Sequence, residues 1–451
     1  RFDDGSSAYM HKTPGSAGDQ QKFTFSFWIK RCGITTGTAM TIFDTEADDD
    51  NQFKIRFNDN GTLTVESKVS DHNDSLITTQ LFRDPSAWSN FVIAFDTTQG
   101  TASNRVKIYH NGTQITAFGT ENYPAEDLNT LVNAANKLYV GTSAQTDAYC
   151  DMYIAEFCLV DGQQLAATSF GEFDEDSPRI WKPKDVSGLT FGTNGFYLDF
   201  EDSSNLGNDV NGGTDLTEVN LAAIDQTTDT PTNNFATLNP LAQTTDKGVI
   251  SEGNLQFDES TDTNAWTAIA STLAASNGKW YFEYLVVDGG DSAGNGTQVG
   301  VINYDKDDFQ NDASSDLSSS YGWYGPGNVF ITGSDEGIMS SYTDGDIVCV
   351  AMDLDNNKIY WRKNGDDWIN SGDPTSGATG TGAQTITDSS GSDFFAFAVS
   401  HREAGDGQAN FGNPIATLSS GNADANGYGN FEHAPPSGYY AMCTKNLAEF
   451  G

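Results

Sequence analysis

The sequence has 451 residues, of which 37% are hydrophobic and 12% aromatic, so it is long enough for two or more globular domains and too apolar for a disordered chain. Acidic residues outnumber basic ones by 63 to 23, and a formal net charge of −40 repels nucleic-acid phosphates and anionic membranes. We therefore expect no nucleic-acid partner and, because no apolar run reaches about 18 residues, no membrane insertion.

Alternation of apolar and polar residues, the period of a half-buried β-strand, recurs along the chain. In chain order it is clearest at Phe23–Lys30, Phe53–Phe57, Arg105–Tyr109 and Lys358–Arg362. Asn-Gly pairs, which favour tight hairpin turns, follow strand-like runs at residues 60–61, 111–112 and 364–365. The sequence predicts an all-β chain of antiparallel sheets.

The pattern divides the chain into four predicted segments. Residues 1–170 and 246–415 each carry enough strands for a sandwich. Residues 171–245 are richer in Asp, Asn, Thr and Pro and predict an acidic connector, partly ordered because Gly195–Phe200 has the pattern of a strand. Residues 416–451 predict an extended tail.

The five cysteines are odd in number and form no C-x-x-C or Cys/His pair of the kind that binds zinc or acts in redox chemistry. We expect them to be buried free thiols. They are Cys32, Cys150, Cys158, Cys349 and Cys443.

Several landmarks in the first predicted sandwich occur in an order that is similar to one known family. They are Phe2–Gly5, Phe23–Lys30, Trp88, Phe91–Asp96, Ile108–Gly112, Tyr139–Gly141 and Met152–Phe157. This part of the chain resembles the concanavalin-like, laminin-G-type family. The resemblance implies a two-sheet jelly roll that binds a glycan or a protein, often with calcium at the rim of the sandwich.

The second predicted sandwich resembles the SPRY family. The residues that carry this resemblance are Gly278–Glu283, Val299–Val301, Tyr321–Trp323, Asp344–Asp353, Ile359–Gly365 and Ala409–Gly412. The family implies a β-sandwich whose variable loops bind partners. Here the inserts Asp305–Ser320 and Asp366–Gly382 would supply those loops.

The combination of both regions resembles large structural proteins of marine bacterial viruses, notably cyanophage-like ones. Residues 170–176 and 180–183 of the connector and Pro436–Leu447 of the tail extend the resemblance beyond the sandwiches. It implies a protein of the virion surface, with other virion structural proteins as partners and with a homo-oligomer, such as a trimer, as its assembly.

Three functions are compatible with these features. The leading hypothesis is a virion-surface or tail-fibre component that recognises a host-surface glycan or protein through its sandwich loops, without catalysis. An architectural capsid or appendage decoration protein with no host ligand is the first alternative. The second is a secreted carbohydrate-active protein.

Candidate contact and metal residues are few. Tyr324 and Trp368 lie at the edges of predicted loops, where a flat aromatic ring can stack on a sugar or a partner surface. Asp44, Asp48 and Asp50 lie between two predicted strands and could converge on calcium, although they lack EF-hand spacing. No cofactor is required, and calcium is the ion for which the sequence offers ligands.

The acidic run Glu172–Asp176 invites comparison with the catalytic strand of jelly-roll glucanases, where carboxylates two residues apart share one face. Its spacing is E-x-D-E-D, and it follows the last strand of the first sandwich instead of lying within it. The five histidines are scattered, and no Ser or Cys lies in a nucleophile elbow. The sequence therefore predicts a non-enzymatic protein.

Overall fold

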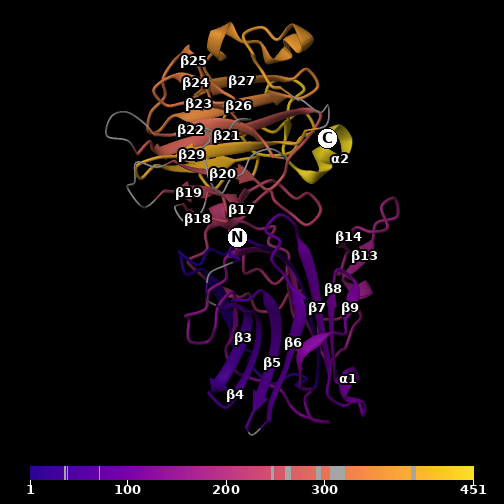
Figure 1. Ribbon diagram of the computed structural model, residues 1–451. Coiled ribbons are helices and arrows are strands. Elements are labelled where there is room, and N and C mark those ends of the chain that lie inside the picture. The colour runs from indigo at the N-terminus through magenta and orange to yellow at the C-terminus, as the bar shows by residue number, and fades with distance from the viewer. Residues whose placement is uncertain are drawn as a thin grey trace. The chain divides into compact units, whose positions relative to one another are not determined.

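Two compact units, Arg1–Gln226 and Thr227–Gly451, make up the chain in the computed structural model (Figure 1). The structure describes residues 1–34, 37, 39–70, 72–244, 248–259, 266–290, 296–304, 320–387 and 393–451. Each unit contains two large β-sheets, in which neighbouring strands are antiparallel apart from one short parallel pair. The predicted all-β class, with antiparallel sandwiches, is confirmed.

The first unit stacks an eight-stranded sheet on a six-stranded sheet. In spatial order the eight-stranded sheet contains β10 (Phe118–Glu121), β6 (His72–Leu81), β5 (Thr62–Val69), β4 (Asn51–Phe57), β3 (Met40–Asp48), β11 (Leu138–Val140), β1 (Tyr9–Lys12) and β16 (Thr217–Val219). The six-stranded sheet contains β15 (Phe196–Leu198), β12 (Met152–Asp161), β2 (Lys22–Arg31), β7 (Ser89–Asp96), β8 (Val106–His110) and β9 (Thr113–Ile115). A separate hairpin joins β13 (Gly171–Phe173) to β14 (Trp181–Pro183).

Aromatic residues from facing strands fill the space between the two sheets. Phe23, Phe25 and Phe27 alternate along β2 and point to the same side of the sheet. The ring centroid of Phe25 lies 4.5 Å from that of Phe43 on β3, which belongs to the opposite sheet. The alternation seen in the sequence therefore produces the core of the first sandwich.

The other side of β2 is also buried. Trp28 packs with apolar side chains of residues 165–191, which we call the first cover. Trp181 of this cover donates a hydrogen bond from Nε1 to Asn90 Oδ1 at 3.1 Å. A Cβ added at Gly112 or Gly171 would lie 2.5 Å from the Trp181 ring, so both glycines leave room for it. The first cover is thus an integral layer of the first unit.

The predicted connector, residues 171–245, differs from what the structure shows. Residues 171–226 belong to the first unit, where β15 pairs with β12 and β16 pairs with β1. Residues 227–245 belong to the second unit and include β17 (Leu238–Gln243). The physical reason is the apolar outer face of the six-stranded sheet, which needs a covering layer.

The second unit has the same arrangement of two facing sheets. One contains β17 (Leu238–Gln243), β20 (Thr267–Ser271), β29 (Phe395–His401), β22 (Gln298–Asn303), β23 (Ser320–Tyr324), β24 (Asn328–Ile331) and β25 (Ser334–Ile338). The other contains β18 (Val249–Ser251), β19 (Gln256–Asp258), β30 (Asp406–Asn410), β21 (Lys279–Asp288), β26 (Ile347–Asp353), β27 (Lys358–Lys363) and β28 (Gln384–Thr385), with β31 (Tyr440–Ala441) parallel to β21. Phe282 of β21 and Phe397 of β29 stack across the core with centroids 5.0 Å apart.

The C-terminal residues cover the outer face of β21. Residues 414–443, which we call the second cover, contribute Phe431 and Tyr439 to a cluster that buries Tyr281. The ring centroids of Phe431 and Tyr281 lie 5.0 Å apart. The predicted extended tail, residues 416–451, is therefore folded onto the second sandwich and ends in α2 (Thr444–Phe450), as Figure 1 shows. Tyr281 alternates with core residues, so this face too requires a cover.

The helical elements described are short. They are α1 (Ala102–Arg105), α2 (Thr444–Phe450) and the 3₁₀ turns η1 (Ala167–Ser169), η2 (Ala223–Asp225), η3 (Ile369–Ser371) and η4 (Pro374–Thr379). Within the described ranges, no helix has the length and apolar character needed to cross a membrane. All five cysteines are buried thiols, as the sequence predicts.

Replacing Trp181 tests whether the first cover is structural. We expect Trp181→Ala to lower the free energy of unfolding of the first unit by about 3–5 kcal/mol, because it leaves a cavity between the cover and the sheet. Differential scanning calorimetry of the full chain should show one of two transitions shifted downward. Ile180→Ala is the control, since Ile180 is 58% exposed and its loss should change stability by about 0.5 kcal/mol or less. Equal effects of the two substitutions would contradict the assignment.

Candidate functional site

Tyr324 is the last residue of β23 and is half-buried. Its ring meets that of Trp266 edge-on, with centroids 5.4 Å apart, and Arg402 Nη2 lies 3.5 Å from its hydroxyl. The Arg402 guanidinium also lies over Trp266, 5.4 Å from the ring centroid. Tyr324 is therefore part of an aromatic and cationic cluster at the ends of several strands.

Trp368 lies in the loop after β27, which belongs to the other sheet of the second unit. The Arg362 guanidinium stacks on its ring at 4.7 Å, and Tyr360 contacts its edge. The structure thus places the two predicted contact residues, Tyr324 and Trp368, in separate clusters, the first at the end of β23 and the second in the loop after β27. The predicted insert Asp305–Ser320 lies outside the described residues apart from Ser320.

The predicted calcium ligands Asp44, Asp48 and Asp50 are not brought together. Asp44 lies inside β3, where its Oδ2 accepts a hydrogen bond from the Ala144 amide at 2.8 Å. Burial raises the pKa of Asp44 to about 7.

Asp48, the last residue of β3, and Asp50, in the exposed turn that follows, line an open depression instead. Asp48 Oδ1 accepts from the Asp50 amide and from Asn51 Nδ2, while Asp50 pairs with Lys68 at 3.0 Å. Their carboxylates form local turn contacts. The prediction of one site from these three residues is corrected, since the bulge and turn separate a buried strand residue from an exposed hairpin tip.

The acidic run 172–176 lies on the β13–β14 hairpin, at the margin of the first unit in Figure 1. The Glu172 side chain is 52% exposed. Asp174 accepts from the Ser177 and Asp176 amides, and the Ser177 amide and Lys182 lower its pKa. A glycosidase general acid needs a raised pKa. This hairpin therefore lacks the environment of a catalytic carboxylate pair.

His401 is the most deeply buried histidine with a described hydrogen-bond network. Its two ring nitrogens lie 2.6 Å from Tyr284 Oη and 3.0 Å from Thr297 Oγ1. Burial lowers the pKa of His401 to about 3, so it is neutral at physiological pH. Its contacts are those of a hydrogen-bonded core residue.

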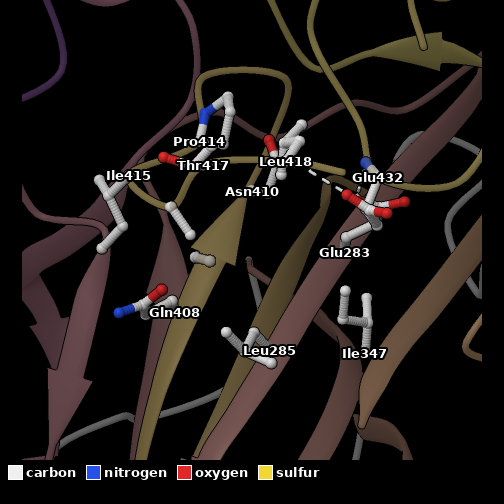
Figure 2. Close-up of a pocket in the computed structure, with 12 residues that line it drawn as sticks. Glu283, Leu285, Ile347, Gln408, Asn410, Pro414, Ile415, Thr417, Leu418 and Glu432 are labelled. Atoms are coloured by element: carbon white, nitrogen blue, oxygen red, sulfur yellow. Dashed lines mark hydrogen bonds between the residues drawn. The ribbon is translucent and has the colours of Figure 1, made fainter. Parts of the chain in front are cut away.

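A small pocket separates the second cover from β21 and β30 (Figure 2). Its volume is about 110 Å³, whereas pockets for small molecules measure about 300–1,000 Å³. Glu283 lies at its polar end and accepts four hydrogen bonds. The donors are Tyr281 Oη, Asn410 Nδ2 and the amides of Glu432 and His433. Glu283 therefore fastens the second cover to the sheet, and the pocket is part of that attachment.

The outer face of the eight-stranded sheet carries an aromatic patch that sequence reasoning missed. Tyr9 and His11 of β1, Tyr139 of β11 and Tyr149 are all half-buried, and we call them the tyrosine platform. The Tyr9 ring lies 6.0 Å from His11, 6.2 Å from Tyr139 and 6.3 Å from Tyr149, centroid to centroid. Lys137 Nζ lies 4.8 Å from the Tyr139 centroid.

Strand register explains how the platform forms. His11 lies opposite Tyr139, which in turn lies opposite Asp44. Asp44 lies opposite Lys54, so a polar row continues from the aromatic residues across the sheet. Met10, between Tyr9 and His11, points into the core. Burial, followed by the charge of Lys137, lowers the pKa of His11, which favours a neutral ring.

The alternation of buried and half-buried residues along β1 and β11 is the sequence signal that could have identified the platform. Tyr9 and His11 flank buried Met10, and Tyr139 lies between buried Leu138 and Val140, so the aromatic residues occupy the face expected to be wet. Their assembly depends on pairing β1 with β11, which are separated by more than 120 residues. No short sequence motif encodes that pairing.

The comparisons with known proteins concern both the sequence and the fold. Residues 4–166 match the family model described as the Concanavalin A-like lectin/glucanases superfamily. The match supports a concanavalin A-like domain in this part of the chain. All four platform residues lie in this domain, whose family fits a recognition role. A search of curated proteins finds no matching sequence.

Several solved structures, SPRY domains among them, are similar to the chain at low identity. The SPRY domain of human HERC1 is 15% identical, with a TM-score of 0.30, over 38% of this chain and 96% of that one. The TRIM65 PSpry domain is 11% identical, with a TM-score of 0.29, over 39% and 92%. Stonustoxin is 13% identical, with a TM-score of 0.29, over 39% and 27%.

Titration of Glu283 should make the second unit less stable as pH rises. Burial raises the pKa of Glu283 from 4.5 to about 7, against the lowering effect of its amide donors. The folded chain therefore binds this proton more tightly than the unfolded chain does. The resulting stability is fully present below about pH 4.5 and is lost as pH rises through 7, a change on the order of 3 kcal/mol.

Glu283→Gln should flatten this part of the pH profile, measured as the second unit's unfolding transition between pH 4.5 and 8. Glu336→Gln serves as the control, since Glu336 is an exposed residue of the same unit and should follow the wild-type curve. Parallel curves for wild type and Glu283→Gln would contradict this role.

Proposed function

We propose that the chain is a non-enzymatic recognition protein on the surface of a virus particle, and that its tyrosine platform binds a host-surface glycan. The platform is the observation that supports this most strongly. Three tyrosines and a histidine gather on one outward-facing sheet, inside the domain that matches the lectin and glucanase superfamily. Aromatic faces can stack on the apolar faces of sugar rings while hydroxyl groups bond to the rim.

The polar groups beside the platform suit a sugar ligand. Tyr139 lies opposite Asp44, and Asp44 lies opposite Lys54 on the next strand. Gln145 donates to Glu46 of the same sheet. A few polar groups next to an aromatic surface fix the orientation of a bound ring. The net charge of −40 favours a neutral or cationic ligand over a polyanion.

A non-enzymatic role is favoured by the surroundings of the acidic and histidine residues. The Glu172–Asp176 run is exposed on a hairpin, and His401 is enclosed in the core. Neither arrangement resembles the paired carboxylates or nucleophile and base that hydrolysis requires. A secreted carbohydrate-active enzyme is therefore the weaker alternative.

The assignment to a virion rests on the resemblance to structural proteins of marine bacterial viruses. On such a particle, many copies would raise a weak single-site affinity by multivalency. We propose a homo-oligomer, such as a trimer, that contacts other virion structural proteins. The same arrangement would present several platforms to one cell surface.

An architectural role has one specific observation in its favour. Phe173 and Ile180, on the β13–β14 hairpin, are 47% and 58% exposed. Large exposed apolar side chains on one hairpin can pack against another subunit. In this alternative the chain would decorate a capsid or appendage and bind no host molecule.

Glycan binding by the full chain tests the proposal directly. On a panel of marine and bacterial-surface glycans, we expect saturable binding that Tyr139→Ala and Tyr149→Ala each weaken by about tenfold, close to the ~1.4 kcal/mol of one stacked ring. Tyr139→Phe keeps the aromatic face and should retain most of the binding. The folded state of each variant is checked by its unfolding transition.

Tyr324→Ala and Trp368→Ala provide the matched comparison in the second unit. We expect both to bind as wild type does. Loss of binding in either of these variants, with the platform variants unaffected, would move the contact surface to the second unit. Absence of binding to any glycan at high avidity would favour the architectural role.

A further inference from the structure

Three carboxylates meet where the N-terminal turn contacts the start of β12. Phe2 and Met152 form a two-way backbone bridge, with N to O distances of 2.9 and 3.0 Å. This bridge places Asp3 and Asp4, which follow Phe2, beside Asp151, which precedes Met152. One carboxylate oxygen from each lies within 4.8 Å of the others. It is the one such group of three acidic, histidine or cysteine side chains in the described part of the chain.

The spacing of these oxygens suits a calcium ion. Calcium binds oxygen at about 2.3–2.6 Å, so ligands on opposite sides of the ion are separated by up to about 5 Å. Asp3 and Asp151 are buried, whereas Asp4 is exposed and leaves the group open to solvent on one side. Water could therefore complete the coordination shell.

Asp151 provides an independent sign of a missing partner. Its side chain is 7% exposed, and its Oδ1 atom is buried without a hydrogen-bond partner. An unpartnered buried carboxylate oxygen is costly, because its ionised form has lost its hydration. Burial, followed by the charges of Asp4 and Asp3, raises the pKa of Asp151 to about 8.

The nearby arginine does not complete the site. Arg31 lowers the pKa of Asp151, but its guanidinium donates to the carbonyls of Phe82 at 2.6 Å and Gly33 at 2.9 Å. Its charge is thus engaged with backbone oxygens. Three acidic side chains share the site with a cation that bonds elsewhere.

We propose that Asp3, Asp4 and Asp151 form a calcium-binding site. A site whose ligands are all oxygen atoms favours a hard cation such as calcium. The neighbouring Cys150 thiol, which could bind a softer metal ion, instead donates a hydrogen bond to Thr41 O at 3.0 Å. The ion would neutralise the repulsion among the carboxylates and give Asp151 Oδ1 its partner. It would also fasten the N-terminal turn to the strand that begins at Met152.

This site is separate from the calcium site expected between β3 and β4, and it does not depend on glycan binding. Its readout is the binding of the metal itself. Asp151 does lie two residues after Tyr149 of the tyrosine platform. The ion would therefore fix one edge of the segment that carries this ring.

Calorimetric titration of CaCl₂ into chelator-treated full chain, at fixed ionic strength, tests the proposal. We expect one saturable site in the wild type and an upward shift of the first unit's unfolding transition with calcium. Asp4→Asn should weaken calcium binding by about tenfold, because it removes one charged ligand. Asp4 is exposed, so this variant should fold normally.

The unfolding temperature of Asp151→Asn, compared with that of the wild type with and without calcium, gives a second test. A purely structural role of Asp151 would not make this difference depend on calcium. Without calcium this variant should unfold at the same or a higher temperature than the wild type, since an amide has no charged form that burial would penalise. With saturating calcium the order should reverse. Asp48→Asn, in the exposed hairpin depression, is the matched control and should bind calcium as the wild type does.

Either of two results would overturn the site. One is calcium binding that is unchanged in Asp4→Asn and Asp151→Asn. The other is an equal response to magnesium at the same concentration, because magnesium requires a tighter octahedral shell and would indicate general screening of the acidic surface. Loss of the response in Asp48→Asn alone would place the ion in the hairpin and reject the proposed ligands.

Discussion

Burial of one central strand on both faces is the constraint on which each sandwich depends. Phe23, Phe25 and Phe27 on β2 face the opposite sheet, while Trp28 faces outward. A strand of this kind cannot lie at the surface of a two-layer sandwich without exposing large apolar side chains to water. Each unit therefore needs a third layer, and the two covers, residues 165–191 and 414–443, supply it.

The covers determine which surfaces remain for binding. In the first unit, the six-stranded sheet is closed by the first cover, and Trp181 fills the space left by Gly112 and Gly171. The outer face of the eight-stranded sheet keeps its polar and aromatic side chains in contact with solvent. The tyrosine platform lies on this face. The proposed binding surface is therefore on the eight-stranded sheet because the first cover occupies the outer face of the six-stranded one.

In the second unit, the cover is held by a polar attachment as well as by apolar contacts. Glu283 lies on the covered face of β21 and receives donors from both the sheet and residues 432–433. Buried carboxylates recur in this acidic chain at Asp44 and Asp151, each with a pKa raised by burial. Both keep one oxygen without a hydrogen-bond partner, but Asp44 Oδ2 lies 3.7 Å from the Lys54 ammonium, whereas Asp151 lies beside two further carboxylates.

Local patterns in the sequence predicted the strands but not the layers. Alternation identified β2, β4, β8 and β27, and the strand pattern of Gly195–Phe200 corresponds to β15. The covers were expected to be a connector and a tail, because Asp, Pro and Gly between short apolar runs look alike whether a segment is free or packed. The sign that these two segments are packed lies elsewhere in the sequence. Trp28 and Tyr281 are large apolar residues on the outer faces of central strands, and such faces need a covering layer.

The site residues were harder to predict because they depend on long-range register. Asp44 and Asp48 are four residues apart on β3 but occupy different environments, since Asp44 is buried within the sheet and Asp48 lies at the exposed end of the strand, next to the hairpin turn. Asp3 and Asp151 are almost 150 residues apart and meet through one backbone bridge. Tyr324 and Trp368 were chosen as loop residues, yet both are held by an arginine and a second aromatic ring.

Hydrogen exchange of the full chain, measured with and without a bound glycan, tests the central claim most directly. The covers should exchange slowly in both states because they are integral layers, and added glycan should slow exchange in residues 9–12 and 138–140 of the open sheet. Fast exchange throughout residues 165–191 would contradict the claim that the cover closes the sandwich. Glycan protection confined to that cover, or to the strands near Tyr324 and Trp368, would contradict the proposed binding face.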